Sequence, residues 1–516
     1  MKKSDINSVY ATRLKCGGDV MTTKPKVVIV GGGFGGLWAA KALKNEPVEV
    51  TLIDRKNHHT FQPLLYQVAT AVLSPGEIAS PIRRILHNAK NIEVILGEAV
   101  GFDKEKKFVK LSDGPEVSYD YLVVAAGARH AYFGHDDWET SAPGLKTIED
   151  ALEIRRRVLL AFELAERDAY LTGTQRPLNF VVVGGGPTGV ELAGAIADIA
   201  RQALAKDFKA IDTTKARVML FEGSDRVLGT FHEKLSASAK KQLENIGVEV
   251  KLNSFVTDIE PGRVKVGKDW IECDVVLWAT GVAASPVGKE LGVETDKAGR
   301  VFVQPDLTIP GHDNIFVIGD MASLKQENDE PVPGVSPAAM QMGTLTAKNI
   351  LASLNGKPRK NFRYVDKGTM ATIGRSKAIA DVQGFHFKGF IAWMMWLFLH
   401  VLFLIGFRNR IYVMLEWFWA YLTRERSARL ITGDADELKN ALHFLNAEPA
   451  KVDVEISVKE KVAARAIVHA VETEKPRARY VVPFLRNRAL IALAEFLPTE
   501  ASDALIQNMT GLRGTR

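Results

Sequence analysis

Glycines and carboxylates recur together in the sequence, each time after a run of β-branched residues. Gly31, Gly33 and Gly36 stand in VVIVGGGFGG, and Asp54 ends the next apolar run. A glycine turn that leads into a helix lets backbone N–H groups approach a pyrophosphate, and an acid further on accepts hydrogen bonds from a ribose. This spacing predicts a dinucleotide site, although a lone turn of this kind can also be a plain strand-to-helix connection.

The pattern occurs a second time. Three glycines precede a helix in VVVGGGPTGVE: Gly184, Gly186 and Gly189. The corresponding acid is Glu222, well beyond the usual spacing of about 20 residues, and a longer helix with the polar stretch 207–215 would account for the excess. An acid there favours NADH over NADPH because it repels a 2′-phosphate, although Arg226 nearby could offset this effect. Two such turns indicate an internal duplication.

Three further predicted strands end in small residues, where backbone can pass close to a bulky group. They are DYLVVAAG with Ala126 and Gly127, VVLWATGV with Gly281, and NIFVIGD with Gly319 and Asp320. The first two strands mirror each other in the two halves of the duplication. The Asp320 carboxylate could contact a ribityl hydroxyl near a second pyrophosphate contact, or it could simply close a strand-end turn.

Composition and charge narrow the class of protein. With 516 residues, 46% of them hydrophobic, the chain predicts an ordered multidomain protein. The net charge is +6 without a block of Lys and Arg, which argues against nucleic acid and suits an anionic membrane surface. Cys16 and Cys273 are too far apart for a dithiol pair and indicate a reducing compartment. No metal site is expected.

A membrane-associating region is predicted towards the C-terminus. Residues 389–407 carry no formal charge, and residues 411–422 carry only Glu416. Basic residues follow each stretch: Arg408 and Arg410, then Arg424, Arg426 and Arg429. Tryptophans flanked by arginines fit two helices that lie in the headgroup plane. The length of the first stretch also satisfies a membrane span, and a buried helix of a soluble protein is the third reading.

Three segments have no such pattern. Residues 1–24 are polar and predict a flexible tail, and residues 433–516 predict a small helical extension of unknown role. Residues 58–75, HHTFQPLLYQVATAVLSP, predict an apolar and aromatic loop without a helical or strand period. Such a loop could contact a cofactor or only pack on the surface.

The motifs from about residue 26 to residue 432 resemble those of type II NADH dehydrogenases. These are membrane-associated, non-proton-pumping NADH:quinone oxidoreductases with two dinucleotide-binding domains. The resemblance rests on VVIVGGGFGGL, FQPLLYQVAT, VVVGGGPTGVELAG, LWATGV, NIFVIGD, VSPAAMQMG and DKGTMATIGR, in this order. It implies an α/β fold in which a Rossmann-like NADH domain (151–290) is inserted into a Rossmann-like FAD domain (25–150 and 291–382). Membrane-associating helices (383–432) would follow, before the small helical extension.

The resemblance also implies roles for single residues. The first glycine turn, Asp54 and Asp320 would serve FAD, and the second turn with Glu222 would serve NADH. Glu191 would lie near the nicotinamide and stabilise charge as hydride leaves, or it could only stabilise a helix N-terminus. Gln341 is the one glutamine kept from a motif assigned to quinone and flavin contact. Lys367 could donate to a quinone oxygen or to the reduced flavin, or be an ordinary surface lysine.

The implied activity is electron transfer from NADH through FAD to a membrane quinone. The implied location is peripheral, at the cytoplasmic face of the inner membrane on an anionic lipid surface, without nucleic acid and with a homodimer left open. The alternative is a soluble NADH-dependent flavoprotein reductase with a protein or other non-quinone acceptor, which would not need the tryptophans between 393 and 419. A sulfide:quinone oxidoreductase would need redox cysteines near the flavin, which two distant cysteines cannot supply.

Overall fold

The structure is a computed structural model and describes residues 24–326, 329–426 and 428–431. The predicted tail up to residue 23 and the predicted helical extension at 433–516 lie outside these residues. Every motif named above lies within the described residues.

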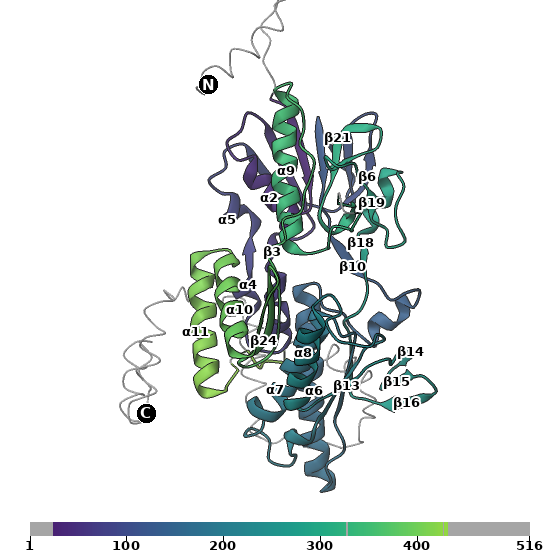
Figure 1. Cartoon of the computed structure of the whole chain (residues 1–516), viewed down its shortest axis with the longest axis vertical. Helices are drawn as coiled ribbons and strands as arrows, with labels where there is room; N and C mark the ends of the chain where they lie inside the picture. Colours follow the sequence, from purple (N-terminus) through teal and green to yellow (C-terminus); the bar gives the residue numbers. More distant parts are fainter. Residues whose placement is uncertain (1–23, 327–328, 427, 432–516) are drawn as a thin grey trace, which may run out of the picture. The chain divides into compact units, whose positions relative to one another are not determined.

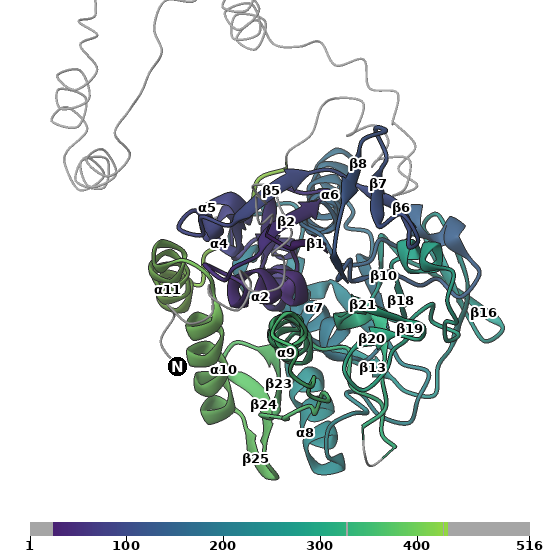
Figure 2. The same cartoon turned by 90° about the horizontal axis from the view of Figure 1, so that it is seen from above.

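The larger sheet has the strand order β20-β21-β9-β1-β2-β5, in which only the β20–β21 pair is antiparallel. Its strands are β1 (Lys26–Val30), β2 (Glu49–Asp54), β5 (Ile92–Leu96), β9 (Tyr121–Val124), β20 (Thr308–Ile309) and β21 (His312–Val317). Residues 27–30 are all buried, as expected for a parallel strand covered on both faces. Helices α2 (Phe34–Ala42) and α9 (Ser336–Leu354) pack against each other beside this sheet (Figures 1 and 2).

A second, fully parallel sheet has the order β13-β12-β11-β17. Its strands are β11 (Asn179–Val183), β12 (Arg217–Phe221), β13 (Val248–Lys251) and β17 (Val275–Trp278), with helices α6 (Ile148–Thr172), α7 (Pro187–Asp198) and α8 (Glu233–Asn245). Helix α7 continues into a π-helical turn at Ile199–Ala203. That longer helix confirms the explanation given for the distance between the second glycine turn and Glu222.

The second sheet is built from residues that lie between β9 and β21 of the first sheet. Strands β10 (Ala128–His130) and β18 (Val282–Ala284) pair antiparallel where the chain leaves for the second sheet and returns from it. The α/β class with two Rossmann-like sheets is therefore confirmed. Two small antiparallel sheets flank these sheets: β6 (Ala99–Asp103), β7 (Phe108–Leu111) and β8 (Glu116–Ser118), and β14 (Val256–Glu260), β15 (Arg263–Val266) and β16 (Asp269–Glu272).

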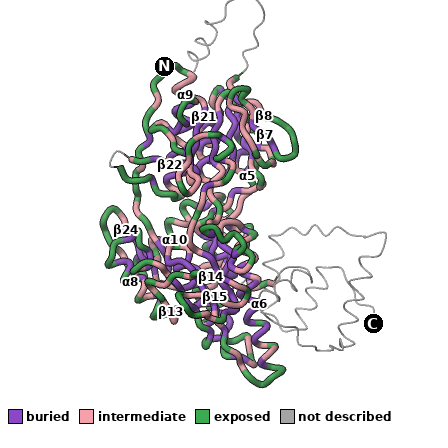
Figure 3. Tube along the Cα trace, turned by 90° about the vertical axis from the view of Figure 1, so that its right-hand side faces the viewer, coloured by how far each residue is buried: buried purple, intermediate pink, exposed green. Residues whose placement is uncertain are grey.

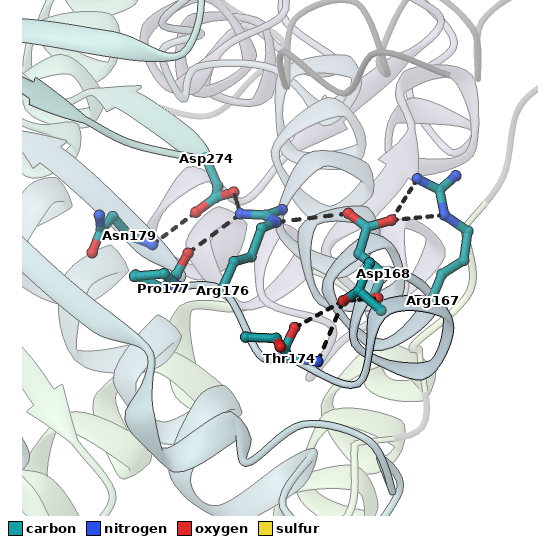
Figure 4. A network of polar contacts seen from close by, with 8 residues as sticks. Arg167, Asp168, Thr174, Arg176, Pro177, Asn179 and Asp274 are labelled. Atoms are coloured by element: carbon teal, nitrogen blue, oxygen red, sulfur yellow. Dashed lines mark hydrogen bonds and ion pairs between the residues drawn. The ribbon is translucent and has the colours of Figure 1, made fainter. Parts of the chain in front are cut away.

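A polar network ties together the strand starts of the second sheet, at the end away from its glycine turn (Figure 4). The guanidinium of Arg176 pairs with the carboxylate of Asp274, which also accepts the Asn179 amide at 2.8 Å. Arg176 also lies 3.8 Å from Asp168 near the end of α6. The network thus fixes α6, β11 and β17 relative to one another.

The described chain ends in an antiparallel sheet and a helix pair. The sheet contains β23 (Thr369–Gly374), β24 (Lys377–Val382) and β25 (Phe385–Lys388), and the pair contains α10 (Phe390–Phe403) and α11 (Phe407–Thr423). Helix α10 packs on β24, and α11 contacts α4 (Pro75–Ile78) (Figure 1). Arg410 caps α10 by donating to the carbonyls of Leu402 and Leu404 at 2.8 Å each.

The helix pair buries few of its residues, whereas buried residues gather in the interior around the two large sheets (Figure 3). Ala392, Trp396 and Val413 are its buried helical residues, and Trp396 and Val413 join the same core as α6, α7 and β11. The large apolar side chains exposed on the pair include Phe390, Ile391, Met394, Phe398, Leu402, Phe403, Phe407, Leu415, Phe418, Trp419 and Leu422. Among the helices of the described residues, none combines the length and apolar character needed to cross a membrane.

Two expectations are wrong. The segment 58–75 is not an irregular loop, because it forms β3 (His58–Thr60), a 3₁₀ turn (Gln62–Leu64), α3 (Leu65–Ala69) and the start of α4. These elements are too short for a hydrophobic period to register. Arg426 and Arg429 do not face a lipid surface: the first is buried, and both pair with carboxylates of the second sheet's helical layer, namely Asp198 and Asp207.

Candidate functional site

The first glycine turn needs glycine at the positions that the sequence indicates. Gly31 has a φ of +104°, and its amide donates to the Ile53 carbonyl at 2.8 Å. A Cβ on Gly31 would collide with the carbonyl of Ala125, and a Cβ on Gly36 would overlap the Gly31 oxygen. At Gly33, the N-cap of α2, a Cβ would meet nothing within 4 Å. The helix N-terminus therefore stays open to a pyrophosphate.

The second turn repeats this geometry on the other sheet. Gly184 has a φ of +108°, and a Cβ there would lie 2.7 Å from the Ala279 carbonyl oxygen. A Cβ on Gly189 would overlap the Gly184 oxygen, whereas one on Gly186, the N-cap of α7, would meet nothing within 4 Å. The duplication in the sequence is thus a duplication of two open helix N-termini.

The two acids occupy matching places. Asp54 Oδ2 accepts the amide of Gly32 at 2.5 Å, and Glu222 Oε2 accepts the amide of Gly185 at 2.5 Å. Each acid stands directly at the carboxyl end of the second strand of its βαβ unit. Because a carboxylate has about four acceptor sites, each one keeps capacity for a ribose hydroxyl.

A cleft of about 700 Å³ opens at the carboxyl ends of the larger sheet. Its lining brings together seven predicted residues: Gly31, Gly33, Asp54, Ala126, Gly127, Gly319 and Asp320. Gly127 and Gly319 have φ values of +70° and +69°, so the chain turns sharply at the wall of the cleft. Gly281, with a φ of +74°, takes the same place after β17 but does not line this cleft. Carboxylates for hydroxyls and free N–H groups for a pyrophosphate fit FAD.

Two histidines from β3 also line the cleft, and the sequence patterns gave neither of them a role. His59 is 2% exposed, and its Nδ1 lies 3.0 Å from the Gly32 carbonyl oxygen. The ring of Phe34 meets His59 edge-on at 4.9 Å. Burial lowers the pKa of His59 to about 4, so at pH 7 the ring is neutral and its Nδ1 proton is donated to Gly32. In the sequence, the position of His59 two residues before the FQPLLY segment could have indicated this role.

A second, smaller pocket of about 120 Å³ lies where α3 and α7 meet β23 and the helix pair. Its polar lining includes Gln67, Glu191, Asp198, Thr372 and Arg426, and its aromatic lining is Tyr66, Trp393, Trp396, Trp417 and Tyr421. The apolar and aromatic share suits a flat organic ring, and the polar groups suit its oxygens. The pocket adjoins the helices that expose apolar side chains.

Glu191 belongs to this second pocket. It lies in the second turn of α7, beyond the first turn in which the helix dipole stabilises an acid. Burial raises the pKa of its carboxyl to about 8, and a hydrogen bond from the Thr372 backbone opposes that rise. Burial raises the pKa of the Tyr66 hydroxyl, and the nearby charge of Glu191 raises it further. At pH 7 the Glu191 carboxyl is mainly protonated and can donate a hydrogen bond.

Hydrogen bonds and ring contacts connect the pocket to the helix pair. The Trp417 indole donates to Gln67 Oε1 at 2.6 Å, and Gln67 Nε2 donates to the Tyr66 hydroxyl at 2.9 Å. Trp396 lies 5.7 Å from Trp417, and His400 stacks on Trp396 at 4.0 Å. The walls of the pocket are therefore partly made of α10 and α11.

Gln341 and Lys367 line neither the cleft nor this pocket. Both amide atoms of Gln341 bond the backbone of Val365, at 3.0 Å each. Lys367 follows two residues later and is exposed. Gln341 thus fixes the segment that carries Lys367, and the quinone or flavin contact assigned to these two residues stays a prediction.

A metal centre or a redox-active thiol would require particular side chains among the described residues. These residues contain no cluster of three or more His, Cys, Asp or Glu side chains placed to hold a metal ion. Cys273 is buried, and burial raises the pKa of its thiol, so a reactive thiolate is disfavoured. The arrangement supports two nucleotides on two sheets and an acceptor beside the helix pair.

Comparisons with known proteins agree with this arrangement. A family model described as pyridine nucleotide-disulphide oxidoreductase matches residues 25–343, and a model of the NDH2 C-terminal domain matches residues 367–425. The type II NADH:quinone oxidoreductase NdhA of Mycobacterium tuberculosis is 46% identical over 425 residues, which cover 79% of this chain and 89% of NdhA.

A second relative and a solved structure extend the comparison. The type II NADH:quinone oxidoreductase Ndh of the same organism is 45% identical over 423 residues, covering 79% of this chain and 90% of Ndh. NDH2 from Plasmodium falciparum in complex with NADH has a TM-score of 0.71 at 20% identity, covering 80% of this chain and 100% of that chain. At that identity the structure supports the fold alone.

Proposed function

Because the chain belongs to the type II NADH:quinone oxidoreductase family, we propose that it oxidises NADH at its second glycine turn and passes two electrons through FAD to a membrane quinone. Proton pumping is not part of this reaction. The observation that carries the proposal is the repeated turn geometry, with Gly33 and Gly186 open at two helix N-termini and a carboxylate behind each turn.

The residues of the first cleft would hold FAD, which supplies hydride acceptance and electron transfer when it is bound. The open amides at the start of α2 would receive the pyrophosphate, and Asp54 would accept from a ribose hydroxyl. Asp320, whose carboxylate lies 4.0 Å from the Lys146 ammonium, would accept from a ribityl hydroxyl. His59 holds the Gly32 carbonyl and so keeps the turn in place.

NADH is the substrate of the second turn. Its pyrophosphate takes the open start of α7, and its ribose hydroxyls face Glu222. Glu191 lies one turn further along the same helix, so a single helix connects the nucleotide turn to the second pocket. This connection supports a role for Glu191 between the two substrates.

The second pocket is the quinone site in this proposal. A quinone needs donors for its carbonyl oxygens, and the lining offers the protonated carboxyl of the half-buried Glu191 and the buried Tyr66 hydroxyl. Gln341 and Lys367 would act at the edge of this region through the segment that they share. Aromatic rings of α10 and α11 provide the apolar walls.

Exposed apolar side chains on α10 and α11 support peripheral membrane association. We place the protein at the cytoplasmic face of the inner membrane, on an anionic lipid surface, where a lipid-soluble quinone would reach the pocket without crossing water. The homodimer stays a prediction, to be checked by the mass of the detergent-solubilised protein. Arg408 and Arg424 are exposed and would face the headgroups.

One experiment tests the reaction. Purified protein should bind a flavin whose absorbance falls when NADH is added without oxygen, and a short-chain quinone should restore that absorbance within the turnover time. A reduced flavin that transfers electrons to a soluble protein but not to the quinone would support the soluble reductase instead. A protein that binds no flavin would overturn both readings.

A further inference from the structure

Arg426 is buried although the two residues before it are exposed. It stands just beyond α11 and one residue past the match to the NDH2 C-terminal domain model. The residue is 7% exposed, whereas Arg424 and Glu425 are exposed. A guanidinium is buried only where several acceptors surround it, so the acceptors of Arg426 identify the segments that it connects.

Three acceptors surround this guanidinium, and they come from two different helices. Nη1 donates to the Thr70 carbonyl at 2.5 Å. Nη2 donates to the Asp198 carboxylate at 2.7 Å and to the Ala195 carbonyl at 3.2 Å. Arg426 therefore links the end of α3, which Thr70 directly follows, to α7, which carries the other two acceptors.

Both helices form walls of the second pocket. Helix α3 contributes Tyr66 and Gln67, and α7 contributes Glu191, one helical turn before Ala195. Arg426 itself lines the same pocket. Arg426 thus bridges the two walls at their far end, in addition to the direct packing of α3 on α7.

The segment that follows Arg426 is also fixed to the helical layer of the second sheet. Arg155 of α6 donates to the Ala428 carbonyl at 2.8 Å. Arg429 donates to the Ala203 carbonyl at 3.1 Å and pairs with Asp207. The end of the helix pair is therefore fastened to α6 and α7.

We propose that Arg426 is a positioning residue for the quinone half-reaction, which holds α3 and α7 at the separation that lets Tyr66, Gln67 and Glu191 face one acceptor. The inference rests on the proposed function, because it takes the second pocket as the quinone site. Lysine cannot replace the guanidinium fully, because one ammonium lacks the planar fork that reaches acceptors on both helices.

The test separates the two half-reactions in the FAD-loaded enzyme. Arg426→Met should leave the rate of flavin reduction by NADH within about twofold, while kcat/KM for a short-chain quinone falls roughly 10- to 100-fold, mainly through KM. Arg426→Lys should recover part of that loss. Arg217→Met is the matched control, because Arg217 makes an ion pair with Glu249 in the second sheet and lies outside both pockets.

A further variant covers the case in which Arg426→Met does not fold. Asp198→Asn keeps the side-chain size, removes the charge that pairs with Arg426, and should raise the quinone KM in the same direction by a smaller factor. FAD content and circular dichroism show whether each variant is folded. If the folded variants are reoxidised at the wild-type rate, or both half-reactions slow equally, the positioning role is overturned. If the wild type itself is not reoxidised by quinone, the proposed function fails instead.

Discussion

The indole N–H of Trp417 donates a hydrogen bond to the side-chain oxygen of Gln67 over 2.6 Å, between residues 350 positions apart. The bond joins α11, which exposes apolar side chains, to α3, which lines the second pocket. Gln67 passes the connection to the Tyr66 hydroxyl at 2.9 Å. A shift of the helix pair would therefore also move Gln67 and Tyr66 in the lining of the second pocket.

Removal of the indole donor should be costly. Trp417→Phe keeps an aromatic ring but leaves the Gln67 oxygen without its partner, and Gln67 is buried. We expect a loss of about 1–3 kcal/mol in stability, seen as a lower thermal midpoint. Gln67→Met in addition should cost less than the sum of the two single changes, because the unpaired oxygen is then gone. Purely additive losses would contradict this coupling.

The parts of the site that depend on local chain geometry could be predicted from the sequence. A turn with a φ of +104° at Gly31 or +108° at Gly184 requires glycine, so the glycines in the sequence indicate the backbone conformation of the turn. Asp54 and Glu222 follow from the same βαβ pattern, because Asp54 ends β2 and Glu222 directly follows β12. Each glycine turn and its acid lie within a single βαβ unit.

The second pocket could not be predicted, because its walls come from distant segments without a shared spacing. Because Arg426 follows an apolar helix in the sequence, the sequence alone predicts that it contacts lipid. Its guanidinium is instead buried and donates to acceptors at the end of α3 and on α7. Glu191 was assigned from its place after the second turn, which gives no information on Tyr66 or Thr372 across the pocket.

NADH should be strongly preferred over NADPH. The Glu222 carboxylate lies at the second turn, where it would repel a 2′-phosphate. Arg226 does not offset it, because its guanidinium contacts Glu233 and the Gly229 carbonyl at 3.2 Å each. We expect kcat/KM for NADH to exceed that for NADPH by on the order of 100-fold. Glu222→Gln should narrow the ratio, and similar values in the wild type would contradict the assignment.

His59 should strengthen FAD binding through the glycine turn. His59→Leu removes the donor to the Gly32 carbonyl, which is worth about 1 kcal/mol and so roughly five- to tenfold in the FAD dissociation constant. His59→Asn can supply an N–H at nearly the same reach and should bind FAD more tightly than His59→Leu. Titration of the apoprotein, followed by flavin fluorescence, gives the constants. Equal constants for both variants would argue against the hydrogen bond.

Glu191 should make stability depend on pH. Its pKa rises to about 8 in the folded protein from a usual 4.5, so between these values the unfolded chain has released a proton that the folded chain keeps. Stability therefore falls as pH rises through this window and levels off above it. Glu191→Gln removes the effect.

The pH dependence can be measured by comparing the stability of Glu191→Gln with that of the wild type. The stability of the variant relative to wild type should increase between pH 5 and pH 8.5 by on the order of 2 kcal/mol, less than the full shift in pKa would give, because Glu191 is only half-buried and solvent screens part of the effect. Thermal midpoints of both proteins at several pH values show this trend. A difference that stays constant with pH would mean that the carboxyl ionises normally.

The exposed apolar face of α10 and α11 should hold the protein on membranes. Deletion of the whole pair is a poor test, because Trp396 and Val413 are part of the main core. Phe398 and Phe418 are 71% and 62% exposed, so charged replacements there leave the core intact. Phe398→Glu with Phe418→Glu should abolish sedimentation with vesicles and leave NADH-dependent flavin reduction unchanged.

The control and the salt dependence make this membrane test specific. Leu171→Glu, at an exposed leucine of α6, should still sediment with vesicles. Since Arg426 and Arg429 are engaged within the protein, only exposed arginines such as Arg408 and Arg424 add about 1 kcal/mol each on an anionic surface. Added salt should therefore weaken binding only slightly. Vesicle binding that survives both charged replacements, or that salt alone abolishes, would show that another surface or plain electrostatics holds the protein.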